Sequence, residues 1–333
     1  MQKRWLLITL VVLLLSSCGE KKAVYRKVSG ATWGTTYNIT YKAVEDLNDS
    51  IVAVMQQVDE SLSAFNNSSL VSRINRGEHV KVDGLFTAVF DISKRVNRCS
   101  GGAFDPTVSP LINLWGFGYD KSVGGEPTQT QIDSALCYVG IADCSLVDEK
   151  IVKKHPLTEF NFSAVAKGYG CDLIAEMMRR NDCEDYMIEI GGEVVLSGEN
   201  PDGKPWRIMI DAPIANNQSV THQRYAVIEP GACGIATSGN YRNYKEIAGR
   251  RVGHTISPTT GRPVETTTAS VTVIAPTAME ADAFATACMA MPLADAMKMM
   301  EAEDGVEAMF IISAGVEKLF TATTSGFPEI KEQ

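Results

Sequence analysis

The sequence lacks an excess of basic residues and several of the motifs that would assign a function directly. It carries 31 Lys and Arg against 40 Asp and Glu, a net charge of −9, which argues against nucleic acid as a partner because phosphate backbones are bound by basic patches. Gly191-Gly192-Glu193 lacks the G-x-G-x-x-G spacing, and Ser238 is not in a G-x-S-x-G elbow. A Rossmann domain is therefore unsupported, and a serine hydrolase is only weakly supported.

Long apolar runs are also missing, and the run at the N-terminus is short. Residues 5–15 are apolar apart from Thr9 and follow Lys3 and Arg4; they are too few for a membrane span of ~20 residues and fit a secretory signal. The run ends in Leu15-Ser16-Ser17-Cys18-Gly19, which resembles a bacterial lipobox with Cys18 as the acylated residue. An ordinary signal peptide with an incidental cysteine is the alternative.

This N-terminus predicts three segments. We expect a signal peptide at 1–17, a lipid-anchored tether at 18–27 and one domain at 28–333. Such a chain would be anchored to a membrane in the bacterial cell envelope and face the periplasm.

The cysteines show no metal-binding pattern. Seven remain besides Cys18, none in a CxxC or zinc-like spacing, so most are interpreted as small core residues. An odd number cannot pair completely, and Cys137 with Cys144 is one possible disulfide.

Strands and helices are interspersed without a regular βαβ rhythm, which predicts an α+β fold. Hydrophobic periodicity predicts helices at 46–62, 84–99, 165–180, 279–291 and 293–302, and strands at 36–41, 186–196 (broken at Gly191-Gly192), 206–211, 225–228, 269–275 and 308–312. Residues 121–131 are rich in Gly, Pro and Thr and predict a surface loop.

One of only four histidines lies in a segment punctuated by two prolines and a glycine. His254-Thr255-Ile256-Ser257-Pro258-Thr259-Thr260-Gly261-Arg262-Pro263 is expected to be neither helix nor strand throughout. A histidine held in a turn beside hydroxyls and an arginine is a candidate proton acceptor near a phosphate.

Two further segments are candidates for phosphate and metal binding. Asp282 and Thr286 are spaced i,i+4 on a predicted helix, which suits a partial magnesium shell, although an acidic helix N-terminus is the alternative. Asn161–Gly170 leads into another helix with Lys167 near its start, which suits an anion site, although simple capping is the alternative. Phe104 and Trp115 could stack on a planar ligand, but such aromatics more often belong to a core.

Taken in order, the motifs resemble the ApbE family of FAD:protein FMN transferases. The matching pieces span roughly residues 28–321 and are W-G-T-T-Y from Trp33, S-L-S-A-F from Ser61, S-R-I-N from Ser72, F-D-P-T-V-S-P-L from Phe104, A-K-G-Y-G-C-D from Ala166, I-G-G-E from Ile190, A-T-S-G-N-Y-R from Ala236, the His254 segment and E-A-D-A-F-A-T from Glu280.

The resemblance implies an ApbE-like fold, with mixed sheets, packed helices and a flavin groove between two α/β halves. It implies that FAD binds with Mg2+ at its diphosphate and that His254 activates the acceptor hydroxyl. By position, metal binding falls on Asp282, Thr286, the carbonyl oxygen of Ala164 and the neighbouring Ala285, and flavin contact falls on Trp33, Phe65, Ala103, Phe104, Asp105, Asn161, Lys167 and Ile256.

The implied reaction transfers FMN from FAD to a threonine of an acceptor protein and releases AMP. The implied acceptors are exposed subunits of respiratory ion-pumping complexes. Three positions depart from common family residues: Ser257 and Asn161 replace aspartates, and Trp33 replaces a methionine. Two other functions stay open, a magnesium-dependent FAD pyrophosphatase that yields FMN and AMP, and a non-catalytic FAD-binding lipoprotein.

Overall fold

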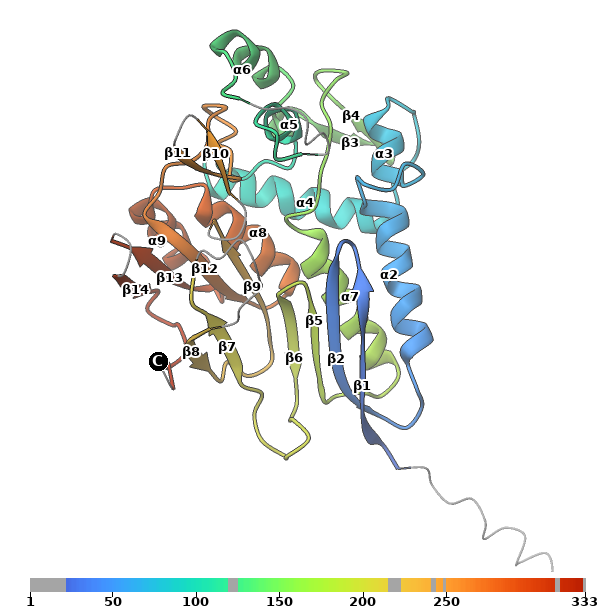
Figure 1. The fold of residues 1–333 in the computed structure, drawn as a ribbon. Coiled ribbons are helices and arrows are strands. Elements are labelled where there is room, and N and C mark those ends of the chain that lie inside the picture. Colours follow the sequence, from blue (N-terminus) through green and yellow to red (C-terminus); the bar gives the residue numbers. More distant parts are fainter. Residues whose placement is uncertain are drawn as a thin grey trace, which may run out of the picture.

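A single antiparallel sheet organises the chain (Figure 1). The computed structural model describes residues 22–118, 125–214, 223–240, 244–247, 250–314 and 318–331. Eight strands pair in the order β1-β2-β5-β6-β9-β12-β13-β14, and each of these pairings is antiparallel. Their bounds are β1 Val24–Thr32, β2 Thr35–Ala43, β5 Tyr186–Ile190, β6 Glu193–Ser197, β9 Cys233–Gly239, β12 Thr268–Ala275, β13 Glu307–Ser313 and β14 Leu319–Thr323.

Helices cover one face of this sheet. The central pair α7 (Ala166–Arg180) and α8 (Ala278–Met289) contact the sheet and each other, while α2 (Asn48–Leu62) packs on α7 and α4 (Gly84–Cys99) packs on α8. The remaining helices are α3 Leu70–Asn75, α5 Ser109–Leu114, α6 Gln129–Leu136, the short η1 Ile141–Asp143 and α9 Leu293–Glu301. Three two-stranded sheets complete the described chain: β3 Ser145–Val147 with β4 Lys150–Val152, β7 Ile208–Asp211 with β8 Arg224–Ile228, and β10 Tyr244–Ile247 with β11 Arg250–Gly253.

Local sequence explains the long helices. In α4, Asp83 caps the first turn by accepting a hydrogen bond from the amide of Phe86 at 2.8 Å, and Phe86, Val89 and Phe90 bury one face of the helix.

The opposite face of the sheet is covered by β7 and β8, whose apolar side chains join those of β6, β9, β12 and β13 in a separate core. The α+β prediction is confirmed by this arrangement.

Several predictions of local structure need correction. Strand β1 begins at Val24, inside the segment expected to be a tether up to residue 27, because Val24–Ala31 pair with β2 along their whole length. The predicted loop at 121–131 ends in α6, whose capping box at Thr128 and Gln131 starts a helix there; residues 119–124 lie outside the described chain. Cys137 is an exposed and Cys144 a buried free thiol, so the disulfide is not formed.

The other predicted helices and strands are present in the structure. The five predicted helices correspond to α2, α4, α7, α8 and α9, and the hairpin through Gly191-Gly192 to β5 and β6. Within the described residues, no helix is both long and apolar enough to cross a membrane. The predicted signal peptide and Cys18 lie outside the described residues.

Candidate active site

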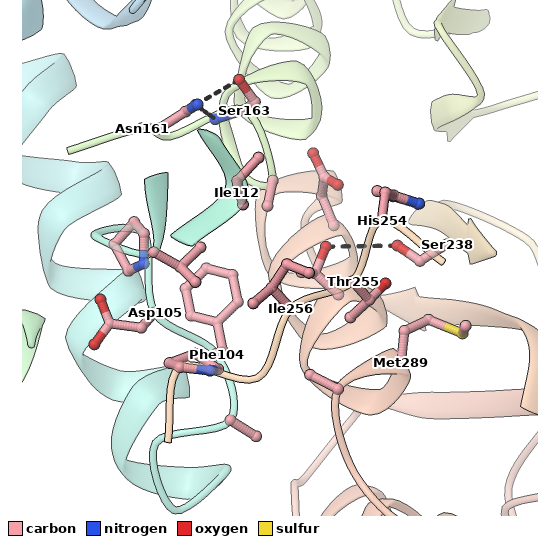
Figure 2. Close-up of a pocket in the computed structure, with 18 of the residues that line it drawn as sticks. Phe104, Asp105, Ile112, Asn161, Ser163, Ser238, His254, Thr255, Ile256 and Met289 are labelled. Carbon is pink, nitrogen blue, oxygen red and sulfur yellow. Dashed lines mark hydrogen bonds between the residues drawn. The ribbon is translucent and has the colours of Figure 1, made fainter. Parts of the chain in front are cut away.

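The segments singled out in the sequence meet at one open pocket of about 440 Å³, a size typical of small-molecule sites. Helical residues at the start of α7 and along α8 form one side, and loops before α5 and around residues 254–258 form the other (Figure 2). The predicted site residues that line it are Ala103, Phe104, Asp105, Asn161, Ala164, Lys167, His254, Ile256, Asp282 and Thr286.

Two glycines let α8 begin close to its neighbours. A Cβ on Gly168 in α7 would lie 2.2 Å from the carbonyl oxygen of Ala278, and a Cβ on Gly234 in β9 would lie 2.1 Å from the nitrogen of Ala278. Only glycine therefore fits at either place without backbone movement. This close approach places Asp282, one turn into α8, against the start of α7.

The start of α8 is capped from a neighbouring helix as well as from its own chain. Asp172 of α7 accepts hydrogen bonds from the amides of Ala278 at 2.9 Å and Met279 at 2.8 Å, and Thr277 accepts one from the amide of Glu280. Burial raises the pKa of Asp172 to about 7, although the two amide hydrogen bonds oppose this change. The capping carboxyl thus ties the two helices together at the start of α8.

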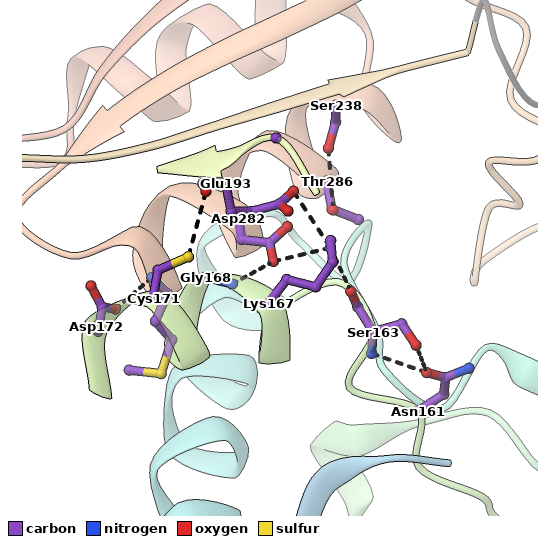
Figure 3. A network of polar contacts seen from close by, with 12 residues as sticks. Asn161, Ser163, Lys167, Gly168, Cys171, Asp172, Glu193, Ser238, Asp282 and Thr286 are labelled. Atoms are coloured by element: carbon purple, nitrogen blue, oxygen red, sulfur yellow. Dashed lines mark hydrogen bonds and ion pairs between the residues drawn. The ribbon is translucent and has the colours of Figure 1, made fainter. Parts of the chain in front are cut away.

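A cluster of charge lies at this helix junction (Figure 3). The Lys167 ammonium lies 3.4 Å from Oδ2 of Asp282 and 3.5 Å from Oε1 of Glu193, and it donates a hydrogen bond to the carbonyl oxygen of Ser163 at 3.0 Å. Oδ2 of Asp282 also accepts the amide hydrogen of Gly168 at 3.2 Å. Asp282 and Glu193 are 3% and 5% exposed, so both carboxylates depend on these partners.

Burial and charge act in opposite directions on this cluster. Burial lowers the pKa of Lys167, but the carboxylates of Asp282 and Glu193 outweigh burial and raise it above its usual range. Burial raises the pKa of Glu193, and the ammonium of Lys167 opposes that rise. The lysine therefore stays charged and gives the pocket a positive charge.

The donor set fits a hard cation such as Mg2+. Asp282, the hydroxyl of Thr286 and the backbone of Ala164 line the same pocket, and Mg2+ prefers oxygen ligands. Oδ1 of Asp282 makes no hydrogen bond within the described chain, and the buried Oε2 of Glu193 has no partner there either. Among the same residues, no three His, Cys, Asp or Glu side chains gather into a metal site, so a cation bound here would rely on hydroxyl, backbone and ligand oxygens.

The His254 segment is irregular, as predicted, and long-range bonds hold it. Ile256 and Pro263 form an isolated antiparallel bridge, and the indole Nε1 of Trp115 donates a hydrogen bond to the carbonyl oxygen of Gly261 at 2.8 Å. The His254 ring meets the Phe117 ring edge-on, with centroids 6.5 Å apart. Trp115 is thus a support of the loop and not a pocket residue.

The two positions at which the resemblance leads one to expect an aspartate, Asn161 and Ser257, both stabilise turns. Oδ1 of Asn161 accepts hydrogen bonds from the amide and the hydroxyl of Ser163 at 3.0 and 2.6 Å. The hydroxyl oxygen of Ser257 accepts one from the amide of Thr260 at 3.2 Å. An aspartate at either position would offer the same acceptor.

Asp105 lines the pocket, yet its carboxylate is used within the protein. Oδ1 accepts hydrogen bonds from the amide and hydroxyl of Thr107 at 2.8 and 2.6 Å, and Oδ2 accepts one from the amide of Ile141 at 3.0 Å. This arrangement fixes the neighbouring Phe104, which is 2% exposed.

Three predicted site residues do not line the pocket. Trp33 lies in the β1–β2 turn, where its ring fills the space a side chain at Gly170 of α7 would need. Phe65 is 71% exposed, and Ala285 is fully buried in α8 and has no side-chain donor. Glu193, Thr237 and Ser238 also line the pocket, although they were not predicted as site residues. For Glu193 the sequence held one signal, because this charged residue begins a strand whose other residues are mainly apolar.

The comparison with known proteins agrees with this arrangement. Residues 33–310 match the model of the ApbE family. The chain belongs to the ApbE family. A relative from Vibrio cholerae serotype O1, named FAD:protein FMN transferase, is 38% identical over 90% of this chain and 91% of its own. Another of that name, from Haemophilus influenzae, is 33% identical over 97% of this chain and 96% of its own.

Solved ApbE structures share the fold. The flavin transferase ApbE from Vibrio cholerae superposes with a TM-score of 0.79 at 34% identity, covering 92% of this chain and 98% of its own. The apo form of the Pseudomonas stutzeri flavinyl transferase ApbE gives 0.81 at 31% identity, covering 91% and 96%. The ApbE match therefore includes both sides of the pocket, from the β1–β2 turn to β13.

Proposed function

We propose that this ApbE-family chain is an FAD:protein FMN transferase, an enzyme that moves FMN from FAD to a threonine hydroxyl of an acceptor protein. The observation that carries the proposal is the pocket, where a histidine on an irregular loop and a cluster of oxygen donors with a lysine line one cavity. The names of the relatives support the same activity.

The reaction is a phosphoryl transfer, in which positioning and charge stabilisation do most of the work. His254 accepts the proton of the acceptor hydroxyl, whose oxygen attacks the phosphorus on the riboflavin side of the diphosphate. The bond from that phosphorus to the oxygen bridging to AMP breaks. The products are a threonine phosphoester of FMN and free AMP.

Other pocket residues bind the substrate. Phe104 and Ile256 offer apolar surface for the flavin, and Lys167 places a positive charge beside the diphosphate. Asp282, Thr286 and the Ala164 carbonyl oxygen would hold Mg2+, which neutralises diphosphate charge when bound. The free Oδ1 of Asp282 supports this part of the proposal.

The partners and location belong to the same proposal. A lipid-anchored cysteine at Cys18 would keep the chain on a membrane of the bacterial cell envelope, facing the periplasm. Subunits of respiratory ion-pumping complexes would then be acceptors within its reach. The supporting observation is the lipobox-like sequence that ends at Cys18-Gly19.

One incubation separates transfer from the other two functions. The chain from residue 19 onward is mixed with FAD, Mg2+ and a candidate acceptor domain, and in-gel flavin fluorescence and AMP are both measured. We expect fluorescence on the acceptor together with AMP. AMP and free FMN without labelling would indicate a pyrophosphatase, and FAD binding with neither product would refute both enzymatic functions.

A further inference from the structure

Glu193 is a buried carboxylate that lines the pocket. It opens β6 directly after the Gly191-Gly192 turn and is 5% exposed. One oxygen, Oε1, pairs with Lys167 at 3.5 Å, whereas Oε2 is buried and has no hydrogen-bond partner within the described chain. Buried polar atoms are nearly always paired, so an unpaired one in a pocket indicates a partner that arrives later.

Lys167 is shared between two carboxylates at similar distance. Its ammonium lies 3.4 Å from Asp282 and 3.5 Å from Glu193, and neither contact is short enough to be a strong ion pair. A divalent cation would be attracted to this cluster by the carboxylate of Asp282. The cation would repel the ammonium, which already lies against Asp282.

We propose that Glu193 is a positioning residue that receives Lys167 when a divalent cation binds Asp282. The ammonium moves away from Asp282 and pairs with both oxygens of Glu193, so that Oε2 gains its missing partner. Asp282 is thereby freed for the cation, and Lys167 stays in the pocket beside the diphosphate. This inference rests on the proposed function, because it assumes a cation at Asp282.

The test measures Mn2+ binding without FAD, by the electron paramagnetic resonance signal of free Mn2+. We expect Glu193→Gln to weaken Mn2+ binding about tenfold, because the ammonium of Lys167 would lose the carboxylate that draws it away from Asp282. Glu189→Gln removes a partly exposed carboxylate from the same hairpin, one that bonds to Asn38 and Gly192, and should leave binding unchanged. Equal affinities of wild type and Glu193→Gln would overturn the proposal.

A second pair of variants tests whether Glu193 acts through the lysine. In a Lys167→Gln background Glu193 has no ammonium to receive, so adding Glu193→Gln should change Mn2+ affinity less than about threefold, which is roughly half of the single effect on a logarithmic scale. The same tenfold loss in both backgrounds would show that Glu193 attracts the cation directly and would refute the positioning role. If Glu193→Gln does not fold, Glu193→Asp replaces it in both backgrounds, because it keeps the charge and shortens the reach.

Asp282→Asn distinguishes this failure from failure of the proposed function. If Asp282→Asn leaves Mn2+ binding unchanged, there is no cation site at Asp282, and both the inference and the metal part of the proposed function fail. If Asp282→Asn weakens binding while Glu193→Gln does not, only the role of Glu193 is refuted.

Discussion

The two sides of the pocket are built in different ways. The helical side, which carries Lys167 and Asp282, belongs to α7 and α8, whose buried residues join the two largest cores. The loop side, which carries Phe104, His254 and Ile256, is supported in part by a small separate cluster: Leu111, Trp115, Ile132, Ala135 and Ile256. The groups that would hold charge are thus fixed by regular packing, and the group that would move a proton lies on irregular backbone.

The largest expected effect separates chemistry on the loop side from binding on the helical side. His254→Ala should lower flavin transfer by about 10²- to 10⁴-fold, the usual contribution of a general base, while FAD binding is retained. Transfer is followed by in-gel fluorescence, and binding by quenching of flavin fluorescence. His79→Ala, at an exposed histidine, is the control, and unchanged transfer in His254→Ala would refute the assignment.

The second prediction concerns the pH dependence of the helical side. The pKa of Asp172 is about 7 in the folded chain against an ordinary 3.8, so the folded state holds this proton more tightly than the unfolded state. The stabilisation of the folded state by protonated Asp172 is complete below about pH 4 and is lost as the pH rises towards 7. The side chain of the Asp172→Asn variant cannot ionise. Between pH 4 and 8 we therefore expect the free energy of unfolding of this variant to rise, relative to that of wild type, by an amount on the order of a few kcal/mol.

Urea unfolding at several pH values measures this difference. Asp185→Asn is the control with the opposite sign, since hydrogen bonds from Glu199 and Lys42 outweigh burial and lower the pKa of Asp185. That variant should lose stability relative to wild type as the pH rises through the acidic range. A pH-independent difference for Asp172→Asn would contradict the burial argument.

The third prediction tests the close approach at the helix junction. Gly168→Ala should destabilise the fold by about 1–3 kcal/mol, the usual cost of overpacking, because its Cβ would lie 2.2 Å from a backbone oxygen. Thermal unfolding measures the change. Gly84→Ala, where a Cβ meets nothing within 4 Å, is the matched control and should be neutral or slightly stabilising.

The smallest expected effect is confined to the loop side. Trp115→Phe removes the hydrogen bond to Gly261 and should cost about 1 kcal/mol, seen as faster hydrogen exchange at the amides of Ser257 and Gly261, which bond within the loop. Trp206→Phe removes an indole hydrogen bond elsewhere in the fold, to the carbonyl oxygen of Ser197 at 2.8 Å, and should leave those two amides unchanged. Equal loosening in both variants would mean that the loop is not held locally.

The same contrast explains what the sequence could predict. Asp282 and Thr286 were paired by their i,i+4 spacing, and both line the pocket, because a helix converts spacing directly into direction. Helix α6 was missed within a Gly- and Pro-rich stretch, and the bond from Trp115 to Gly261 joins residues 146 apart. Local patterns contain no signal for such distant pairs.

Glu193 was missed for a related reason. Its position after a glycine turn was recognised only as part of a motif, and its burial follows from the approach of α7 and α8 to β6. A single sequence does not show that a carboxylate at the start of a strand will be covered by two helices. Phe65, which the resemblance implies contacts flavin, is exposed and lies outside the pocket lining, and its role stays a prediction.

The start of β1 at Val24 also limits the distance between Cys18 and the pocket. Only residues 19–23 separate Cys18 from Val24, and a linker of this length spans roughly 20 Å when fully extended. Strand β1 then extends about 27 Å to the turn at Trp33. Gly191 and Glu193, which line the pocket, lie at the same end of the sheet as this turn. If the chain is anchored as proposed, its pocket works within roughly 50 Å of the lipid surface, and a threonine displayed farther out would be beyond its reach.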